Sequence, residues 1–249
     1  MVENLSRPWR ALAVRLSVFP AAPWEAPADL WEQVVGDRPD TEQNQPRAQV
    51  RVHTGSWRNR QLQLTASPLS IVWVTWPNSD EEGLPNLEKE LVVDVLPEFF
   101  AITRSWLASL DFEVKRIGVG LQAVLPAQDR VSAYKMLQDL VPSVDMEPET
   151  TTDFLYQINR PVPSRVLGSQ VRLNRLMKWF ALSFKVTPIQ VAPQITQAGP
   201  ALGRDYAGVE SDINTPADLA GSLDKRLLEA IYDELVELSQ KILEYGERA

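Results

Sequence analysis

The sequence contains no cysteine and a single histidine among its 249 residues. The absence of cysteine excludes disulfide bonds, cysteine nucleophiles and thiolate metal ligands. A histidine-based zinc site needs more than one such ligand, and any Ser-His-Asp triad would have to use His53. His53 lies in the alternating stretch VRVHTGSW, which favours a structural position on a strand. We therefore expect no cofactor.

The chain also lacks long apolar runs and an excess of positive charge. SIVWVTW and ALAVRLSVF fall short of the roughly 18 residues that a membrane-spanning helix needs, so no membrane segment is expected. The start, MVENLSRPWRALAV, lacks the pattern of a secretory signal, and we expect a cytoplasmic protein. The net charge of −8 repels phosphate backbones, which argues against a nucleic-acid partner.

What the sequence does contain is an ordered change of apolar period between two and about 3.6. In the first half this predicts a strand, a short helix, a polar loop, three strands and a helix that begins at Asn86. Their ranges are 11–19, 28–36, 37–46, 48–57, 60–66, 69–76 and 86–106. The second half predicts the same order, with a strand at 112–126, a helix at 129–141, strands at 153–161, 178–188 and 205–215, and a closing helix.

This order predicts an α+β fold of two sequential β-α-β-β-β-α halves, residues 1–110 and 111–249, with antiparallel sheets and helices packed on one face. The interpretation is an internal duplication, although chance can produce the same order. Whether the halves form one sheet or two stays open.

The closing helix is expected to begin at Ser222 and to end at Gly246. Its apolar side chains recur at spacings of four and three, which predicts burial against the second sheet. A seam between two copies of the helix is the alternative. The residues expected to be buried are Leu227, Ile231, Leu235 and Leu238.

Two acidic residues precede this helix on a predicted strand. Glu210 and Asp212 point to the same strand face, and the amide of Asn214 continues it. Such oxygens are ligands for a hard cation, so these residues are weak metal candidates. A solvated sheet face without metal is the favoured interpretation, because nothing nearby identifies further ligands.

A second motif is Glu113-Val-Lys115. Nucleases of the restriction-endonuclease superfamily carry a similar Glu-x-Lys on a strand, with an upstream acid, to bind magnesium and activate water. The nearest spaced acid, Asp94, falls in a helical pattern instead. A magnesium-dependent phosphodiesterase that uses Glu113 and Lys115 is therefore the alternative function, and an ion pair on the sheet is the favoured interpretation.

Two sets of residues are candidates for binding. The densest basic stretch, NRPVPSRVLGSQVRLNRL, contains Arg160, Arg165, Arg172 and Arg175, and predicted strands carry Trp73, Trp76 and Trp179. The proline-rich segment 186–203 is expected to be irregular. Loops or an aromatic sheet face could thus hold a protein partner or a second copy of the chain. The alternatives are ordinary connecting loops and indoles that point into the core.

Finally, KRIGVGLQAVLP, DINTPAD and IYDELVELSQKILEYGE resemble a sporadically distributed prokaryotic family of roughly this length, found near defence or mobile-element genes. The resemblance covers mainly residues 110–249. It implies an accessory or interaction protein and carries no active-site residues across. Taken together, we expect a non-enzymatic protein-binding or assembly module.

Overall fold

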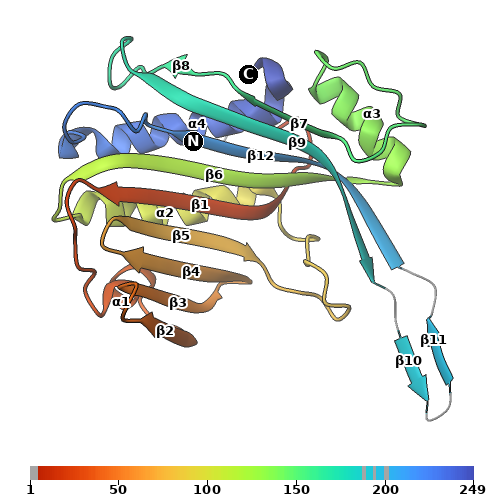
Figure 1. Ribbon diagram of the computed structural model, residues 1–249, viewed down its shortest axis with the longest axis horizontal. Helices are drawn as coiled ribbons and strands as arrows, with labels where there is room; N and C mark the ends of the chain where they lie inside the picture. The colour runs from red at the N-terminus through yellow and green to blue at the C-terminus, as the bar shows by residue number, and fades with distance from the viewer. Residues whose placement is uncertain (1–4, 187–188, 193–194, 199–201) are drawn as a thin grey trace.

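The computed structural model describes the chain except for residues 1–4, 187–188, 193–194 and 199–201. It combines helices with a large antiparallel sheet, which confirms the expected mixture of elements (Figure 1). The helices are α1 (Leu30–Val35), α2 (Val92–Ser109), α3 (Arg130–Leu140) and α4 (Leu228–Tyr245), with 3-10 turns at Lys225–Leu227 and Gly246–Arg248. The strands are β1 (Arg10–Pro20), β2 (Thr41–Gln45), β3 (Val50–Trp57), β4 (Arg60–Ser67), β5 (Ser70–Pro77), β6 (Val114–Ala127), β7 (Leu155–Asn159), β8 (Val162–Pro163), β9 (Arg172–Val186), β10 (Ile189–Ala192), β11 (Ile195–Ala198) and β12 (Leu202–Asn214).

One ten-stranded sheet runs through both parts of the chain, in the order β2-β3-β4-β5-β1-β6-β12-β9-β7, with β8 also paired to β9. The neighbouring strands are antiparallel. The central pair is β1 and β6, which join along most of their length. On one side of this pair follow β5, β4 and β3, and on the other follow β12, β9 and β7.

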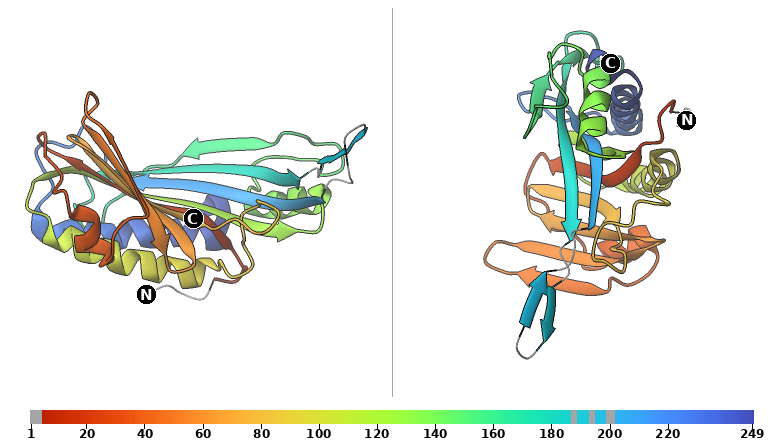
Figure 2. Two further views of the ribbon diagram at one scale, coloured as in Figure 1. Left: turned by 90° about the horizontal axis from the view of Figure 1, so that it is seen from below. Right: turned by 90° about the vertical axis from the view of Figure 1, so that its right-hand side faces the viewer.

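The long helices lie side by side on one face of the sheet (Figure 2). α2 contacts β1, α4 contacts β6 and β12, and the two helices contact each other. The core between helices and sheet is rich in aromatic side chains. Trp73 lies 5.9 Å from Trp31 and 5.9 Å from Trp106 between ring centroids. Trp9, Trp31, Trp73, Trp179 and Tyr232 are among the largest fully buried side chains.

The closing helix begins later than the sequence predicts. Ser222 donates its hydroxyl to Glu113 instead of capping a helix, and Asp224 accepts from the backbone of Arg226 to start a 3-10 turn. Leu227, which lies in that turn, is 36% exposed, so its predicted burial is wrong. Ile231 and Leu235 are fully buried and Leu238 is half-buried.

Gly246 ends α4 as expected, with a positive φ of 64°. A β-carbon at this position would lie 2.3 Å from the carbonyl oxygen of Leu140, the last residue of α3. Only glycine allows this approach, which brings the end of α4 against the end of α3.

The predicted start of α2 at Asn86 is also wrong. The residues just before the helix instead run beside the start of β1. The backbone N–H of Ala11 donates to the carbonyl of Glu90 at 2.7 Å, and Arg10 forms an antiparallel β-bridge with Leu91. The helix begins at Val92 and continues through Pro97. Apolar spacing identified the helix but could not separate its first turn from an extended lead-in.

Two segments expected to be irregular contain strands. The polar segment 37–46 includes β2, which pairs with β3 although each of its side chains is exposed. Within the proline-rich segment 186–203, β10 and β11 pair as a hairpin that projects from the body (Figure 1). Among the described residues, no helix is long and apolar enough to cross a membrane.

Candidate functional site

The two faces of the sheet differ because side chains alternate along each strand. On β5, Ile71 and Trp73 are fully buried toward the helices. Val72, Val74 and Trp76 point to the opposite face and are half-buried. Within the described part of the chain, no helix lies over this second face (Figure 2).

Strand β9 continues the pattern on the far side of the central pair. Met177 and Trp179 are fully buried, whereas Leu176, Phe180 and Leu182 point to the uncovered face. We call this surface the open face. Its side chains include Arg15, Gln63, Thr65, Val72, Val74, Trp76, Gln122, Leu176, Phe180, Glu210 and Asp212.

One end of the open face has a cover of its own. The connection from β5 to α2 places Leu87 on Val124 and Tyr206, which are buried by it. Arg204 on β12 holds the connection through Asp80 at 2.9 Å and Glu82 at 3.2 Å. Burial would raise the pKa of Asp80, but hydrogen bonds from Leu84 and Arg204 lower that pKa below its usual value.

A strip of paired charges crosses the middle of the open face. Arg15 on β1 binds Asp212 on β12 at 2.8 Å, reaching across β6. It can do so because Gly120 lies beneath it: a β-carbon there would come within 3.0 Å of the Arg15 guanidinium. Beside this pair, Lys178 on β9 lies 3.6 Å from Glu210 on β12.

Asn214 extends this strip as a hydrogen-bond hub. Its side-chain oxygen accepts from Arg116 at 2.8 Å and from Asn174 at 3.0 Å. Its side-chain nitrogen donates to Asp212 at 2.7 Å. The predicted shared face of Asp212, Glu210 and Asn214 is therefore present, but cationic side chains and amides occupy its oxygens. Among the described residues, no group of three His, Cys, Asp or Glu could hold a metal ion.

Glu113 and Lys115 both contact the segment that precedes α4. Glu113 precedes β6 and accepts the hydroxyl of Ser222 at 2.7 Å. The amine of Lys115 donates to the carbonyls of Leu219 and Gly221. These contacts fasten the segment before α4 to the end of β6, which gives both residues a structural role.

The predicted binding tryptophans divide between the two faces. Trp73 and Trp179 are 0% exposed, so they belong to the core and cannot touch a partner of the folded chain. Trp76 is three residues from Trp73, and alternation places it on the open face. The alternative of inward indoles thus holds for two of the three.

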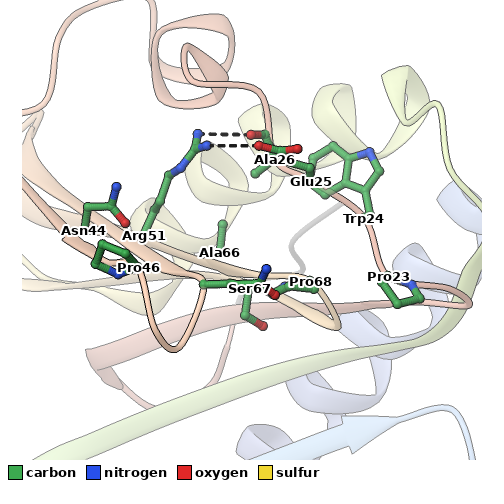
Figure 3. A pocket seen from close by; sticks show the side chains of 11 residues that line it. Pro23, Trp24, Glu25, Ala26, Asn44, Pro46, Arg51, Ala66, Ser67 and Pro68 are labelled. Atoms are coloured by element: carbon green, nitrogen blue, oxygen red, sulfur yellow. Dashed lines mark hydrogen bonds and ion pairs between the residues drawn. The ribbon is translucent and has the colours of Figure 1, made fainter.

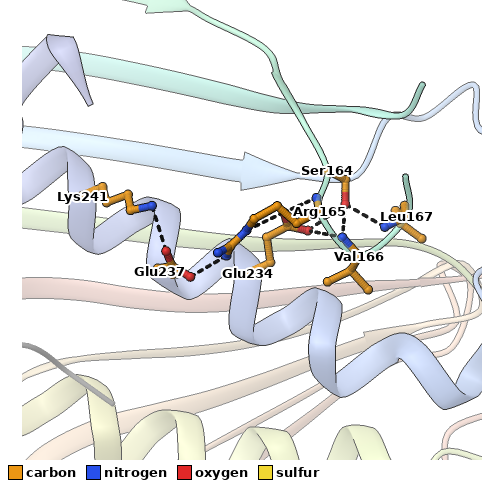
Figure 4. Close-up of polar contacts among 7 residues, drawn as sticks. All are labelled: Ser164, Arg165, Val166, Leu167, Glu234, Glu237 and Lys241. Carbon is orange, nitrogen blue, oxygen red and sulfur yellow. Dashed lines mark hydrogen bonds and ion pairs between the residues drawn. The ribbon is translucent and has the colours of Figure 1, made fainter. Parts of the chain in front are cut away.

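The predicted basic surface serves mainly to attach a loop to α4. Glu234 is 3% exposed and accepts from the Ser164 hydroxyl at 2.7 Å and from the Arg165 backbone at 2.6 Å (Figure 4). The Arg165 guanidinium also donates to the Glu237 carboxylate, and this hydrogen bond raises the pKa of Arg165.

The other three arginines of that stretch also bind this chain. Arg160 donates to the Glu247 carbonyl at 2.8 Å, Arg175 donates to the carbonyl of Ala249, and Arg172 donates to the carbonyl of Pro161. Arg175 is only 6% exposed, and burial lowers its pKa. Composition indicated a basic patch, but alternation on β9 turns Arg175 toward the helices.

His53 is structural in position. It is 6% exposed, and its ring lies 6.4 Å from that of Trp31 between centroids. A further feature was absent from the sequence predictions: a groove at the end of the first-half strands, lined by Trp24 and Arg51 among others. Its residues come from three connections and the strand ends beside them, so no local motif could reveal it.

No model of a known protein family matches the chain, and no curated protein matches it either. The resemblance of residues 110–249 to a sporadically distributed family stays a prediction.

Proposed function

We propose that the chain is a non-enzymatic binding or assembly module and that its open face docks a protein partner. The observation that carries this proposal is the uncovered sheet face itself. A sheet with a layer on one side only normally exposes polar side chains on the other. Here Val74, Trp76 and Phe180 lie on the uncovered side instead.

The distribution of these side chains suits a docking surface. β5 and β9 stand four strand positions apart, which corresponds to about 19 Å at roughly 4.8 Å per strand. Their apolar side chains flank the charged strip of Arg15 and Asp212. A standard interface buries about 800 Å² on each partner, which a surface of this width can provide.

The charged strip favours a partner with polar groups at its centre. Within the described residues, the Nε atoms of Arg15 and Arg116 are buried without a hydrogen-bond partner. Such donors leave hydrogen-bonding capacity unused. Because these two atoms have almost no exposed surface, a partner would instead meet the exposed parts of the Arg15 and Asp212 side chains, which are 40% and 33% exposed. In the setting that the family resemblance implies, this partner is another component of a defence or mobile-element system.

The proposal is tested by Val74→Glu combined with Phe180→Glu, which adds two charges to the open face without touching the core. The matched control is Tyr245→Glu, because Tyr245 is 63% exposed on α4. We expect the tagged wild type and the control to retain the same partner from the native host, and the double variant to lose it. Light scattering on the purified chain distinguishes a separate partner from a second copy. If the wild type is a homodimer through the open face, the double variant should be a monomer. A wild-type monomer that retains no partner contradicts the proposal.

We also propose that residues 1–110 and 111–249 are two copies of one β-α-β-β-β-α unit whose helices cover one shared face. The strand order supports this, since β1, β5, β4 and β3 run outward from the centre as β6, β12, β9 and β7 do. Each half ends in a long helix, α2 or α4, that packs beside the other.

A further inference from the structure

A groove of about 380 Å³ lies where three connections of the first half meet. Residues 23–26 follow β1, and residues 66–68 lead from the end of β4 into the β4–β5 turn. The β2–β3 hairpin contributes Asn44, Pro46, Gln49 and Arg51. Small-molecule sites have volumes of roughly 300–1,000 Å³, so this space suits a small ligand.

Hydrogen bonds hold the walls of the groove together. The backbone of Trp24 donates to the carbonyl of Pro68 at 2.9 Å, which ties the first connection to the third. The Arg51 guanidinium donates to the carbonyl of Ala26 at 3.1 Å, which ties the first connection to the second. The groove is therefore a built feature of this fold.

One wall is aromatic. Trp24 is half-buried, and its ring packs on Phe112 with 4.5 Å between centroids, which helps to fix the position of the indole. Pro46 and Pro68 add flat apolar surface to the lining. In Figure 3, Trp24 and Arg51 stand on opposite sides of the view, with Ser67 and Pro68 below and between them.

The other wall carries a cation whose partner is loosely held. The Arg51 guanidinium lies 3.6 Å from the carboxylate of Glu25, and the Glu25 side chain is 92% exposed. Exposed pairs at such a distance are weak, because water screens them and the side chain must be ordered. Arg51 therefore already pairs with a carboxylate, that of Glu25, but the carboxylate of a bound ligand can displace it.

We propose that this groove binds a small carboxylic acid carried on an aromatic ring. The carboxylate pairs with Arg51 in place of Glu25, and the ring packs on Trp24 and the neighbouring prolines. Asn44 and Ser67 line the groove and offer further polar contacts. The site goes beyond partner docking, because it takes a free small molecule. A peptide ending in phenylalanine carries the same chemistry and serves as the second arm of the test.

The test is a titration of ¹⁵N-labelled protein with 3-phenylpropionate, read from the tryptophan indole signals. Trp24→Phe identifies the Trp24 signal, and the buried Trp73 and Trp179 serve as internal controls. We expect the Trp24 signal alone to move, and neutral 3-phenylpropanamide to leave it in place. Arg51→Gln should weaken binding by about tenfold or more, because a charged hydrogen bond is lost. Glu25→Gln should strengthen binding, because the internal competitor is removed.

Arg47→Gln is the matched control, since Arg47 is an exposed residue of the same hairpin that does not line the groove. It should bind like the wild type. Equal binding of the neutral amide, equal affinity of Arg51→Gln, or no movement of the Trp24 signal at millimolar acid overturns the proposal. Tighter binding of the peptide than of the free acid overturns the assignment to a small molecule.

Discussion

The hydroxyl of Thr103 on α2 lies 2.6 Å from the phenol oxygen of Tyr232 on α4, and both side chains are fully buried. This contact joins helices that close the two halves of the chain. Around it, Arg104 on α2 pairs with Glu229 at 3.0 Å and Asp233 at 3.1 Å on α4. Burial raises the pKa of Tyr232, so the phenol stays protonated and can share this bond.

The pair predicts unequal effects of its two conservative substitutions. Thr103→Val leaves the buried phenol of Tyr232 without a partner and should reduce the free energy of unfolding by about 1–3 kcal/mol. Tyr232→Phe should cost less, because the Thr103 hydroxyl also donates to the carbonyl of Phe99 at 2.7 Å. Urea denaturation of both single variants and the double variant measures this. If both single variants lost the same free energy of unfolding, the unpaired Tyr232 phenol would not be the cause of the cost of Thr103→Val.

The division into halves predicts fragment complementation. Residues 1–110 and 111–249, produced as separate chains, should associate, because the β1–β6 pair and the contact of α2 with α4 both cross the break. Gel filtration and circular dichroism of the mixture would detect the complex. Thr103→Val should weaken it. Fragments that fold separately and ignore each other would contradict the division.

The buried ion pair of Arg60 and Glu90 predicts a large cost of breaking it. Arg60 is 4% exposed and Glu90 is 5% exposed, and the guanidinium also donates to Thr75 at 3.1 Å. Burial lowers the pKa of Arg60, although the Glu90 carboxylate opposes this. Glu90→Gln should reduce the free energy of unfolding by about 3 kcal/mol or more, because a buried charge loses its partner.

The control for that variant is Glu98→Gln. Glu98 pairs with Arg58 at 2.8 Å, but both side chains are well exposed. Its loss should cost less than about 1 kcal/mol in the same denaturation assay. If Glu90→Gln and Glu98→Gln reduced the free energy of unfolding equally, burial would not explain the cost of breaking the Arg60 pair.

Glu247 predicts part of the acid sensitivity of the fold. Burial would raise its pKa, but hydrogen bonds from the side chain and backbone of Ser143 and the charge of Arg160 lower the pKa below its usual value. A lowered pKa in the folded state adds stability above the pKa of the unfolded chain, about 4.3, and this contribution is lost as pH falls. The stability cost of Glu247→Gln should therefore be larger at pH 7 than at pH 3. A cost independent of pH in guanidinium titrations would refute this.

The fold was predictable where side chains alternate cleanly. Alternation of Ile71, Trp73 and Thr75 with their neighbours identified β5, and spacing of four and three identified α4. It failed where structure depends on distant partners. β2 has no apolar alternation and exists because β3 lies beside it. Ser222 is a residue type that often caps helices, but here its hydroxyl donates to the carboxylate of Glu113.

The candidate site was predictable only in part, for a physical reason. Alternation requires Trp73 and Trp76 to face opposite sides, but the position of the helices decides which side is covered. That position depends on long-range packing, such as the contact of Thr103 with Tyr232. The groove between Trp24 and Arg51 likewise needs three connections to meet in space.

The open face as a docking surface is tested most directly by photocrosslinking, because the chain has no native cysteine to interfere. Gln63→Cys, beside Val74 on the open face, and Tyr245→Cys on α4 would each carry a benzophenone label in extracts of the native host. We predict one crosslinked product from the Gln63 position. Excess unlabelled wild type should abolish it, whereas the Val74→Glu, Phe180→Glu double variant should not. Equal crosslinking from both positions, or none from Gln63, would contradict the account.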